Sequence, residues 1–286
     1  MATHLKTAAK VADLAVLRGR AKRYSCRGLY REAAECLLEA LKRLKPQRFS
    51  PSPDHLIVWN EIGMVCKYLG KFQMAENYYR LALRHARRVF HGSFRDLFLA
   101  SLYHNLGGLD HSRRHYLRGE RYARRGLQLR LKSTGVLSLG AASDMVALAA
   151  LLDGQRKFAE SETLYMRALP VYRREYRRSH PELAVLLNNL ASLYHATNRP
   201  TRAEPLFRAT LRMNRRELGA LHPDVGVTLN NFGMFYCSQG KSRQAGRCFQ
   251  QALRILEERV GSTHPNTRAV RANYRRLNDK KHISDR

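Results

Sequence analysis

Residues 180–198 read HPELAVLLNNLASLYHATN, and residues 222–240, which begin 42 positions later, read HPDVGVTLNNFGMFYCSQG. A partial third copy, HPNTRAVRANYRRL, begins after a further 42 positions at His264. Copies at a constant interval of this length are typical of repeat proteins, in which every copy is one supersecondary unit. The fold is therefore decided by how far this repeat extends along the chain.

The repeat extends over six copies, which align through three columns of equivalent positions. Successive members of each column are 42 or 44 residues apart. One column is always leucine: Leu41, Leu83, Leu127, Leu169, Leu211 and Leu253. The other two hold small residues: Ala21, Gly63, Gly107, Ala149, Ala191 and Gly233 in one, and Ala33, Ala75, Gly119, Ser161, Ala203 and Ala245 in the other. Small residues allow two helices to approach closely, so each copy is expected to be a tight helix pair.

Apolar residues within a copy follow the spacing of a helix. Leu187, Leu190, Ala191 and Tyr194 recur at i, i+3, i+4 and i+7. The column between the two predicted helices suits a left-handed residue that ends a helix, and it holds Gly28, Gly70, Arg114, Arg156, Asn198 and Gly240. Proline suits the first position of a helix, and Pro181, Pro223 and Pro265 stand where a new pair begins. No segment needs strand-like alternation, so the fold class is all-α.

These motifs resemble the tetratricopeptide repeat, in the 42-residue form of kinesin light chains. The resemblance is carried by LNNLASLY with AEPLFRATL, and by LNNFGMFY with AGRCFQQAL, and it covers roughly residues 11–277. It implies a right-handed superhelix, or α-solenoid, of about six helix pairs with a C-terminal capping helix. It also implies a concave groove that binds extended peptides or partner proteins.

The repeat register predicts a single solenoid over residues 1–278 and a flexible tail over 279–286. The repeats are expected at approximately 11–45, 54–90, 95–132, 138–178, 181–218 and 223–260, and the cap helix at 265–278.

Three residues depart from the pattern. Asp110 takes a position that is apolar or aromatic in other copies, which predicts that the first helix of the third repeat ends early or packs loosely. Pro170 and Pro205 fall inside predicted second helices, where proline removes a hydrogen bond, so local kinks are expected.

In the resembling family, the first helix of each pair lines the groove, and the residue two before the small column faces inward. Asparagine can bond both edges of an extended backbone, since its amide offers two donors and an acceptor. The groove residues expected here are Glu61, Asn105, Asn189, Asn231 and Asn273. The alternative is that these asparagines are structural, as is expected of the neighbouring Asn60, Asn188 and Asn230. The Lys, Arg and Asn set that holds a terminal carboxylate in some relatives is not assembled, which disfavours a chaperone-type C-terminal peptide.

Positive charge dominates the chain. There are 52 Lys and Arg residues against 23 Asp and Glu, for a net charge of +29, which predicts an anionic partner. The helix dipole explains one cation at each helix end, and codon usage is a further alternative. Many of the cations form a predicted basic ridge near the ends of second helices: Arg84, Arg87, Arg88, Arg130, Lys132, Arg173, Arg174, Arg177, Arg178, Arg212, Arg215 and Arg216.

The function predicted from these features is a non-enzymatic scaffold or adaptor. Its groove would bind a protein or extended peptide of acidic character. The alternative is a nucleic-acid-associated protein whose basic ridge contacts RNA or DNA phosphates. No catalytic residue, cofactor or metal site is expected, because the His-Pro pairs suit helix starts and the five cysteines lack ligand spacing. Scattered cysteines and the lack of a long apolar run predict a cytoplasmic protein that does not insert into membranes.

Overall fold

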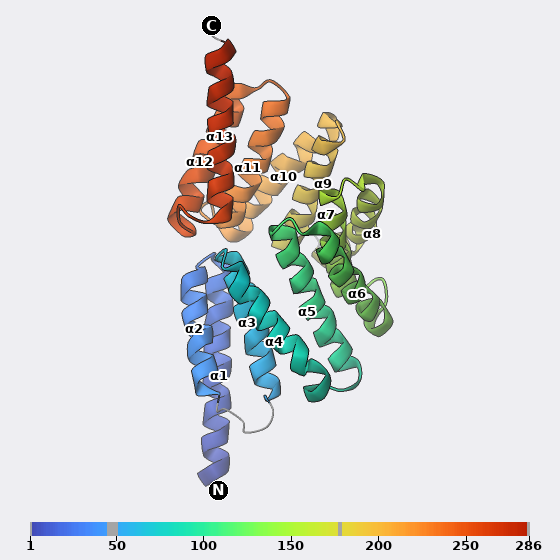
Figure 1. The fold of residues 1–286 in the computed structure, drawn as a ribbon, viewed down its shortest axis with the longest axis vertical. Coiled ribbons are helices and arrows are strands. Elements are labelled where there is room, and N and C mark those ends of the chain that lie inside the picture. Colours follow the sequence, from blue (N-terminus) through green and yellow to red (C-terminus); the bar gives the residue numbers. More distant parts are fainter. Residues whose placement is uncertain (1, 45–50, 177–178, 285–286) are drawn as a thin grey trace. The chain divides into compact units, whose positions relative to one another are not determined.

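The computed structural model describes residues 2–44, 51–176 and 179–284, and within these ranges it describes side chains from residue 13 to residue 279. The described residues form thirteen helices and no strand, so the all-α prediction is confirmed. The chain divides into two compact units, Met1–Gln155 and Arg156–Arg286, which can be followed by colour in Figure 1.

The first unit consists of antiparallel helix pairs. Helix α1 packs on α2, α3 on α4 and α5 on α6, while the first helices α3, α5 and α7 contact one another in succession. The helices of this unit are α1 (Ala2–Cys26), α2 (Tyr30–Arg43), α3 (Pro53–Tyr68), α4 (Phe72–Val89), α5 (Gly92–Ser112), α6 (Tyr116–Thr134) and α7 (Leu139–Gly154).

The second unit repeats this arrangement. Helix α9 packs on α10 and α11 on α12, and α13 covers both α11 and α12. The helices are α8 (Phe158–Tyr176), α9 (Pro181–Ala196), α10 (Pro200–Leu218), α11 (Pro223–Ser238), α12 (Ser242–Arg259) and α13 (Pro265–Ser284). The last helix therefore continues beyond residue 278, where the sequence predicted its end.

The turn between the helices of a pair has the expected left-handed backbone. All six residues of the predicted turn column have positive φ, including the non-glycine residues Arg114 (61°), Arg156 (64°) and Asn198 (54°). The amide that follows the turn bonds back to the end of the first helix, as from His115 N to Asp110 O (2.8 Å) and Arg199 N to Tyr194 O (2.8 Å). These bonds satisfy carbonyls that the end of a helix would otherwise leave unpaired.

Each pair is held closely together at the small-residue column. A Cβ atom at Gly63 would lie 2.5 Å from the Tyr79 ring, and one at Gly233 would lie 2.6 Å from the Phe249 ring. Both rings are fully buried. The aromatic ring of the second helix therefore occupies the space that a side chain on the first helix would need.

The early end predicted for the first helix of the third repeat is wrong. Helix α5 continues to Ser112, and Asp110 lies inside it with only 1% of its surface exposed. The buried carboxylate accepts hydrogen bonds from Arg118 of α6, at 2.8 Å from Nε and 2.5 Å from Nη2. An arginine on the second helix thus compensates for the acidic residue on the first.

The two internal prolines also differ from expectation, because α8 and α10 continue through Pro170 and Pro205 without a break. Both prolines lie on exposed positions. The carbonyl groups that lose a helical donor belong to Met166 and Thr201, which are exposed as well. Solvent can therefore hydrate these carbonyls, which lowers the cost of keeping the helix regular.

Histidine caps the helices that begin at the His-Pro pairs, as the sequence predicted. The Nδ1 atoms of His180, His222 and His264 accept hydrogen bonds from the amides of Glu182 (3.2 Å), Asp224 (3.2 Å) and Asn266 (3.1 Å). Such bonds satisfy amides of the first helical turn. This role requires an unprotonated Nδ1.

Gly233→Ala is expected to lower the free energy of unfolding of the second unit by about 1–3 kcal/mol, since its methyl group would overlap the Phe249 ring. Gly246→Ala is the matched control. A Cβ there meets its nearest neighbour, Leu277, at 3.8 Å, so this variant should gain about 0.5–1 kcal/mol of helix propensity. Denaturant unfolding of both variants measures the difference. A Gly233→Ala protein as stable as the Gly246→Ala protein would contradict the close approach.

His222 should make the second unit sensitive to acid. Burial lowers the pKa of His222 and the charge of Arg259 lowers it further, against the opposing effect of Asp224. Below an unfolded pKa of about 6.5, the unfolded chain therefore takes up a proton that the folded chain refuses, and stability falls as the pH falls. His222→Asn, which keeps a cap without titrating, should reduce the loss in melting temperature between pH 7.5 and pH 5.5. An unchanged pH dependence would assign the acid sensitivity to other groups.

Candidate functional site

Three asparagines of the predicted groove column connect the first helices of consecutive repeats. The Nδ2 atom donates to the Oδ1 atom of an asparagine one repeat earlier, from Asn105 to Asn60 (2.8 Å), Asn231 to Asn188 (3.5 Å) and Asn273 to Asn230 (3.0 Å). All of these side chains are half-buried. The column thus has a structural role in both units.

Glu61 takes part in an ion pair at the equivalent position of the first two repeats. Arg18 of α1 donates to its carboxylate from Nη2 (2.7 Å) and from Nε (2.9 Å). Arg18 stands in register with Asn60, and Glu61 with Asn105. An ion pair here replaces the amide pair of the next junction, so the Glu61 carboxylate is already engaged.

Asn189 differs from the other asparagines of the column. Within the described ranges, its side chain makes no hydrogen bond, although it is half-buried on α9. The position one repeat earlier that holds an asparagine at other junctions holds Val146. Valine offers no acceptor, so the amide of Asn189 retains two donors and an acceptor for another molecule.

A second polar column, which the sequence interpretation missed, lies at the start of the second helices. Glu76, Glu120, Glu162 and Glu204 each contact the end of the following first helix or the turn after it. Glu120 accepts from Gln155 (2.7 Å), Glu162 from Arg199 (2.8 Å), and Lys241 lies 3.8 Å from Glu204. The recurring glutamate next to the small column was the available signal.

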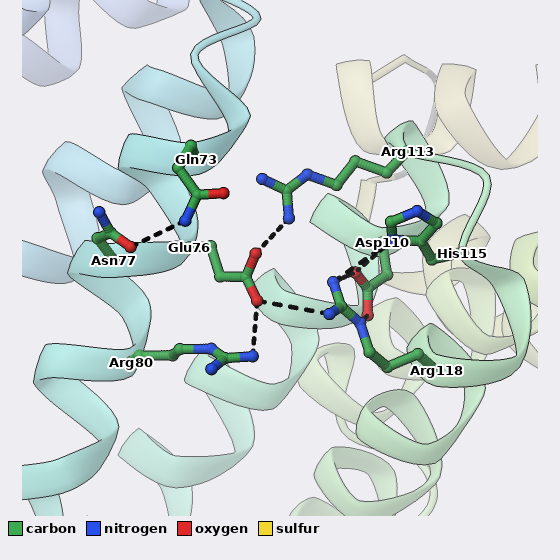
Figure 2. Close-up of polar contacts among 8 residues, drawn as sticks. All are labelled: Gln73, Glu76, Asn77, Arg80, Asp110, Arg113, His115 and Arg118. Carbon is green, nitrogen blue, oxygen red and sulfur yellow. Dashed lines mark hydrogen bonds and ion pairs between the residues drawn. The ribbon is translucent and has the colours of Figure 1, made fainter.

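The densest part of this glutamate column joins α4, α5 and α6, and Figure 2 shows its side chains converging. Glu76 is paired with Arg80 (2.8 Å), with Arg113 and more distantly with Arg118 (3.6 Å). Burial raises the pKa of the Glu76 carboxyl, but the hydrogen bond from Arg113 and the charges of the three arginines outweigh it, and the pKa lies below its usual value. Arg118 also pairs with Asp110, so one guanidinium connects both carboxylates.

Arg130 of the predicted basic ridge turns inward. Its Nε donates to Asp144 of α7 (2.7 Å), and its side chain is only 15% exposed. The same buried carboxylate bonds the Nδ1 atom of His104 (2.7 Å). Arg130 is therefore a structural residue between α6 and α7.

The other described members of the ridge are exposed: Arg84, Arg87, Arg88, Lys132, Arg173, Arg174, Arg212, Arg215 and Arg216. Some contact neighbours, such as Arg216 with Glu217 (2.7 Å) and Arg215 with Gln251 (3.1 Å). Arg177 and Arg178 lie outside the described residues. No position for a catalytic centre emerges from these contacts.

Two further features bear on the chemistry that the chain can perform. In the described side chains, no group of three or more His, Cys, Asp or Glu residues is arranged to hold a metal ion. Among the described residues, none of the helices combines the length and apolar character that a membrane span requires.

Comparisons with solved structures show the fold. BtubC (BKLC) from P. vanneervenii is 20% identical, with a TM-score of 0.52 over 86% of this chain and 91% of that chain. A Rap protein complexed with Competence and Sporulation Factor is 14% identical, with a TM-score of 0.69 over 86% of this chain and 65% of that one. Aspartyl phosphate phosphatase F from Bacillus subtilis is 10% identical, with a TM-score of 0.57 over 94% of this chain and 71% of that chain.

Sequence comparisons give the family. None of the curated proteins searched matches the chain. Three family models, each described as a tetratricopeptide repeat, match residues 57–86, 141–216 and 225–266. These matches fall in both units and agree with the helix pairs, the turns and the 42-residue register. The chain belongs to the tetratricopeptide repeat family.

Proposed function

We propose that the chain is a non-enzymatic interaction scaffold that binds an extended, acidic peptide segment of a partner protein. The binding surface is formed by the first helices α9, α11 and α13, which carry Asn189, Asn231 and Asn273. A cytoplasmic location stays a prediction. The observation that carries the proposal is the amide of Asn189, which no neighbouring repeat uses.

The other asparagines prepare this surface. Asn231 and Asn273 are each fixed by a hydrogen bond to the preceding repeat, so their remaining polar atoms are held in place before a partner arrives. Fixed groups lose less conformational freedom on binding. A peptide backbone presents donors and acceptors along both edges, and amides repeated along successive helices can pair with them with little dependence on sequence.

Charge favours an acidic partner. The net charge of +29 attracts anionic segments and speeds their encounter with the chain. The Rap protein that shares this fold was solved in a complex with Competence and Sporulation Factor, so the fold accommodates a bound factor.

Peptides selected from a random library against the whole chain provide probes for this surface. Asn189→Ala should weaken the selected peptides about 2- to 10-fold, the equivalent of one or two lost hydrogen bonds, and should leave the melting temperature unchanged. Asn231→Ala is the matched structural variant. It removes the bond to Asn188, so its melting temperature should fall. Calorimetric titration and thermal unfolding measure both effects, and unchanged affinity of every selected peptide for Asn189→Ala would exclude the proposed surface.

A second candidate function, binding to nucleic-acid phosphates, is favoured by the exposed cations of the basic ridge. Binding through several phosphates releases counterions, so the affinity for a 20-nucleotide single-stranded RNA should fall by orders of magnitude between about 50 and 200 mM salt. Changing Arg84, Arg87 and Arg88 together to Gln should reduce the slope of this dependence, because these side chains are exposed. Fluorescence anisotropy at four salt concentrations measures the slope. Affinity that does not depend on salt would remove nucleic acid as a candidate.

A further inference from the structure

A pocket of about 590 Å³ lies between α10 and α11 in the second unit. It differs from the asparagine surface, because the second helix α10 supplies most of its wall. The residues that give it chemical character are Thr201, Pro205, Arg208 and Arg212 from α10, and Phe235 and Gln239 from α11. Phe235 is almost fully buried and forms an apolar wall, while Gln239 adds a polar amide.

The pocket contains a backbone acceptor that the helix itself does not satisfy. Inside a regular helix the carbonyl of Thr201 would accept a bond from the amide of residue 205. Residue 205 is Pro205, which has no N–H, so this bond cannot form. Both residues are exposed and line the pocket. A ligand that carries a hydrogen-bond donor can therefore pair with the Thr201 carbonyl.

The two arginines of the pocket differ in their engagement. Arg208 donates to Glu204 (2.6 Å) and to the hydroxyl of Tyr236 (3.3 Å), and it lies over the Phe232 ring. Arg212 is exposed, and in the described part of the chain no carboxylate lies within ion-pair distance of it. Arg212 therefore has a guanidinium that an anionic group of a ligand can reach.

This combination does not recur at the neighbouring junctions. In the register of the repeat, Pro205 and Arg212 correspond to Thr163 and Pro170 one repeat earlier, and to Arg247 and Arg254 one repeat later. Neither alternative combines a free helix carbonyl with a cation two turns further along the same helix.

We infer that this pocket binds a peptide segment with an acidic residue beside an aliphatic one. A peptide N–H pairs with the Thr201 carbonyl, the aliphatic side chain covers Pro205 and Phe235, and the carboxylate meets Arg212. A free phosphate fits less well, since at neutral pH it offers mainly acceptors and no apolar part. The inference relies on the proposed function only in that the partner is a protein, since the pocket is a separate contact site.

The test uses the peptide acetyl-Gly-Leu-Glu-Leu-Gly-amide and its glutamine counterpart, titrated to millimolar concentration into the isotope-labelled full chain. Nuclear magnetic resonance shifts should cluster on α10 and α11, and the glutamine peptide should bind about two- to fivefold more weakly, as expected for one exposed ion pair. Arg212→Gln should bind the two peptides equally. The titrations are repeated in Asn189→Ala, where the pocket should keep its affinity although the asparagine surface is impaired.

Pro205→Ala separates a binding role from a structural one. Alanine restores the helical N–H, so the melting temperature should rise while both peptides bind about 2- to 10-fold more weakly, because the Thr201 carbonyl is then occupied. Pro170→Ala is the matched control in α8, and it should raise the melting temperature without changing peptide affinity. The inference is overturned if Pro205→Ala leaves peptide binding unchanged. It is also overturned if the shifts fall on α9, α11 and α13 and disappear in Asn189→Ala, a result that would support the proposed function alone.

Discussion

The close approach of the two helices in each pair is the constraint on which the other contacts depend. At Gly63 and Gly233, the ring of Tyr79 or Phe249 lies where a Cβ atom would be, which fixes the separation of the helices in each pair. With that separation fixed, residues 43 to 45 positions apart meet at similar distances between the first helices, as in the bonds from Asn105 to Asn60 and from Asn273 to Asn230. Apolar packing thus sets the geometry, and the polar side chains use it.

Because the geometry recurs, one position accepts several chemistries. The pair formed by Arg18 and Glu61 is ionic, whereas its equivalent one repeat later is a pair of amides. Likewise, Arg130 pairs with Asp144 (2.7 Å), and two repeats later Asn214 donates to Thr228 (3.1 Å) at the same two positions. A buried ion pair is seldom more stabilising than a neutral pair of similar shape, but losing one partner is costly, so such positions must change in pairs.

The sequence sufficed for features that depend on local or nearest-neighbour contacts. The left-handed turn at Asn198 and the small residue at Gly233 each follow from one helix pair. The burial of Asp110 was not predicted, because it depends on Arg118 lying on the facing helix. The asparagine column was misleading for a related reason: whether its amide is occupied depends on the residue one repeat earlier. A comparison of Val146 with its equivalents in the register would have distinguished Asn189 from Asn231.

These contacts suggest where an array of repeats keeps capacity to bind. A regular junction satisfies its own polar groups, as at Asn231, and has little left to offer a partner. An irregular junction leaves a group unsatisfied at a defined position: the side-chain amide at Asn189, where the preceding repeat supplies valine, and the backbone carbonyl at Thr201, where Pro205 supplies no donor. Half-buried or pocketed groups of this kind are costly to leave unpaired, so a partner that pairs with them gains more than it would at a fully hydrated surface. We therefore expect specificity to come from the breaks in the repeat pattern, and the regular positions to hold the breaks in place.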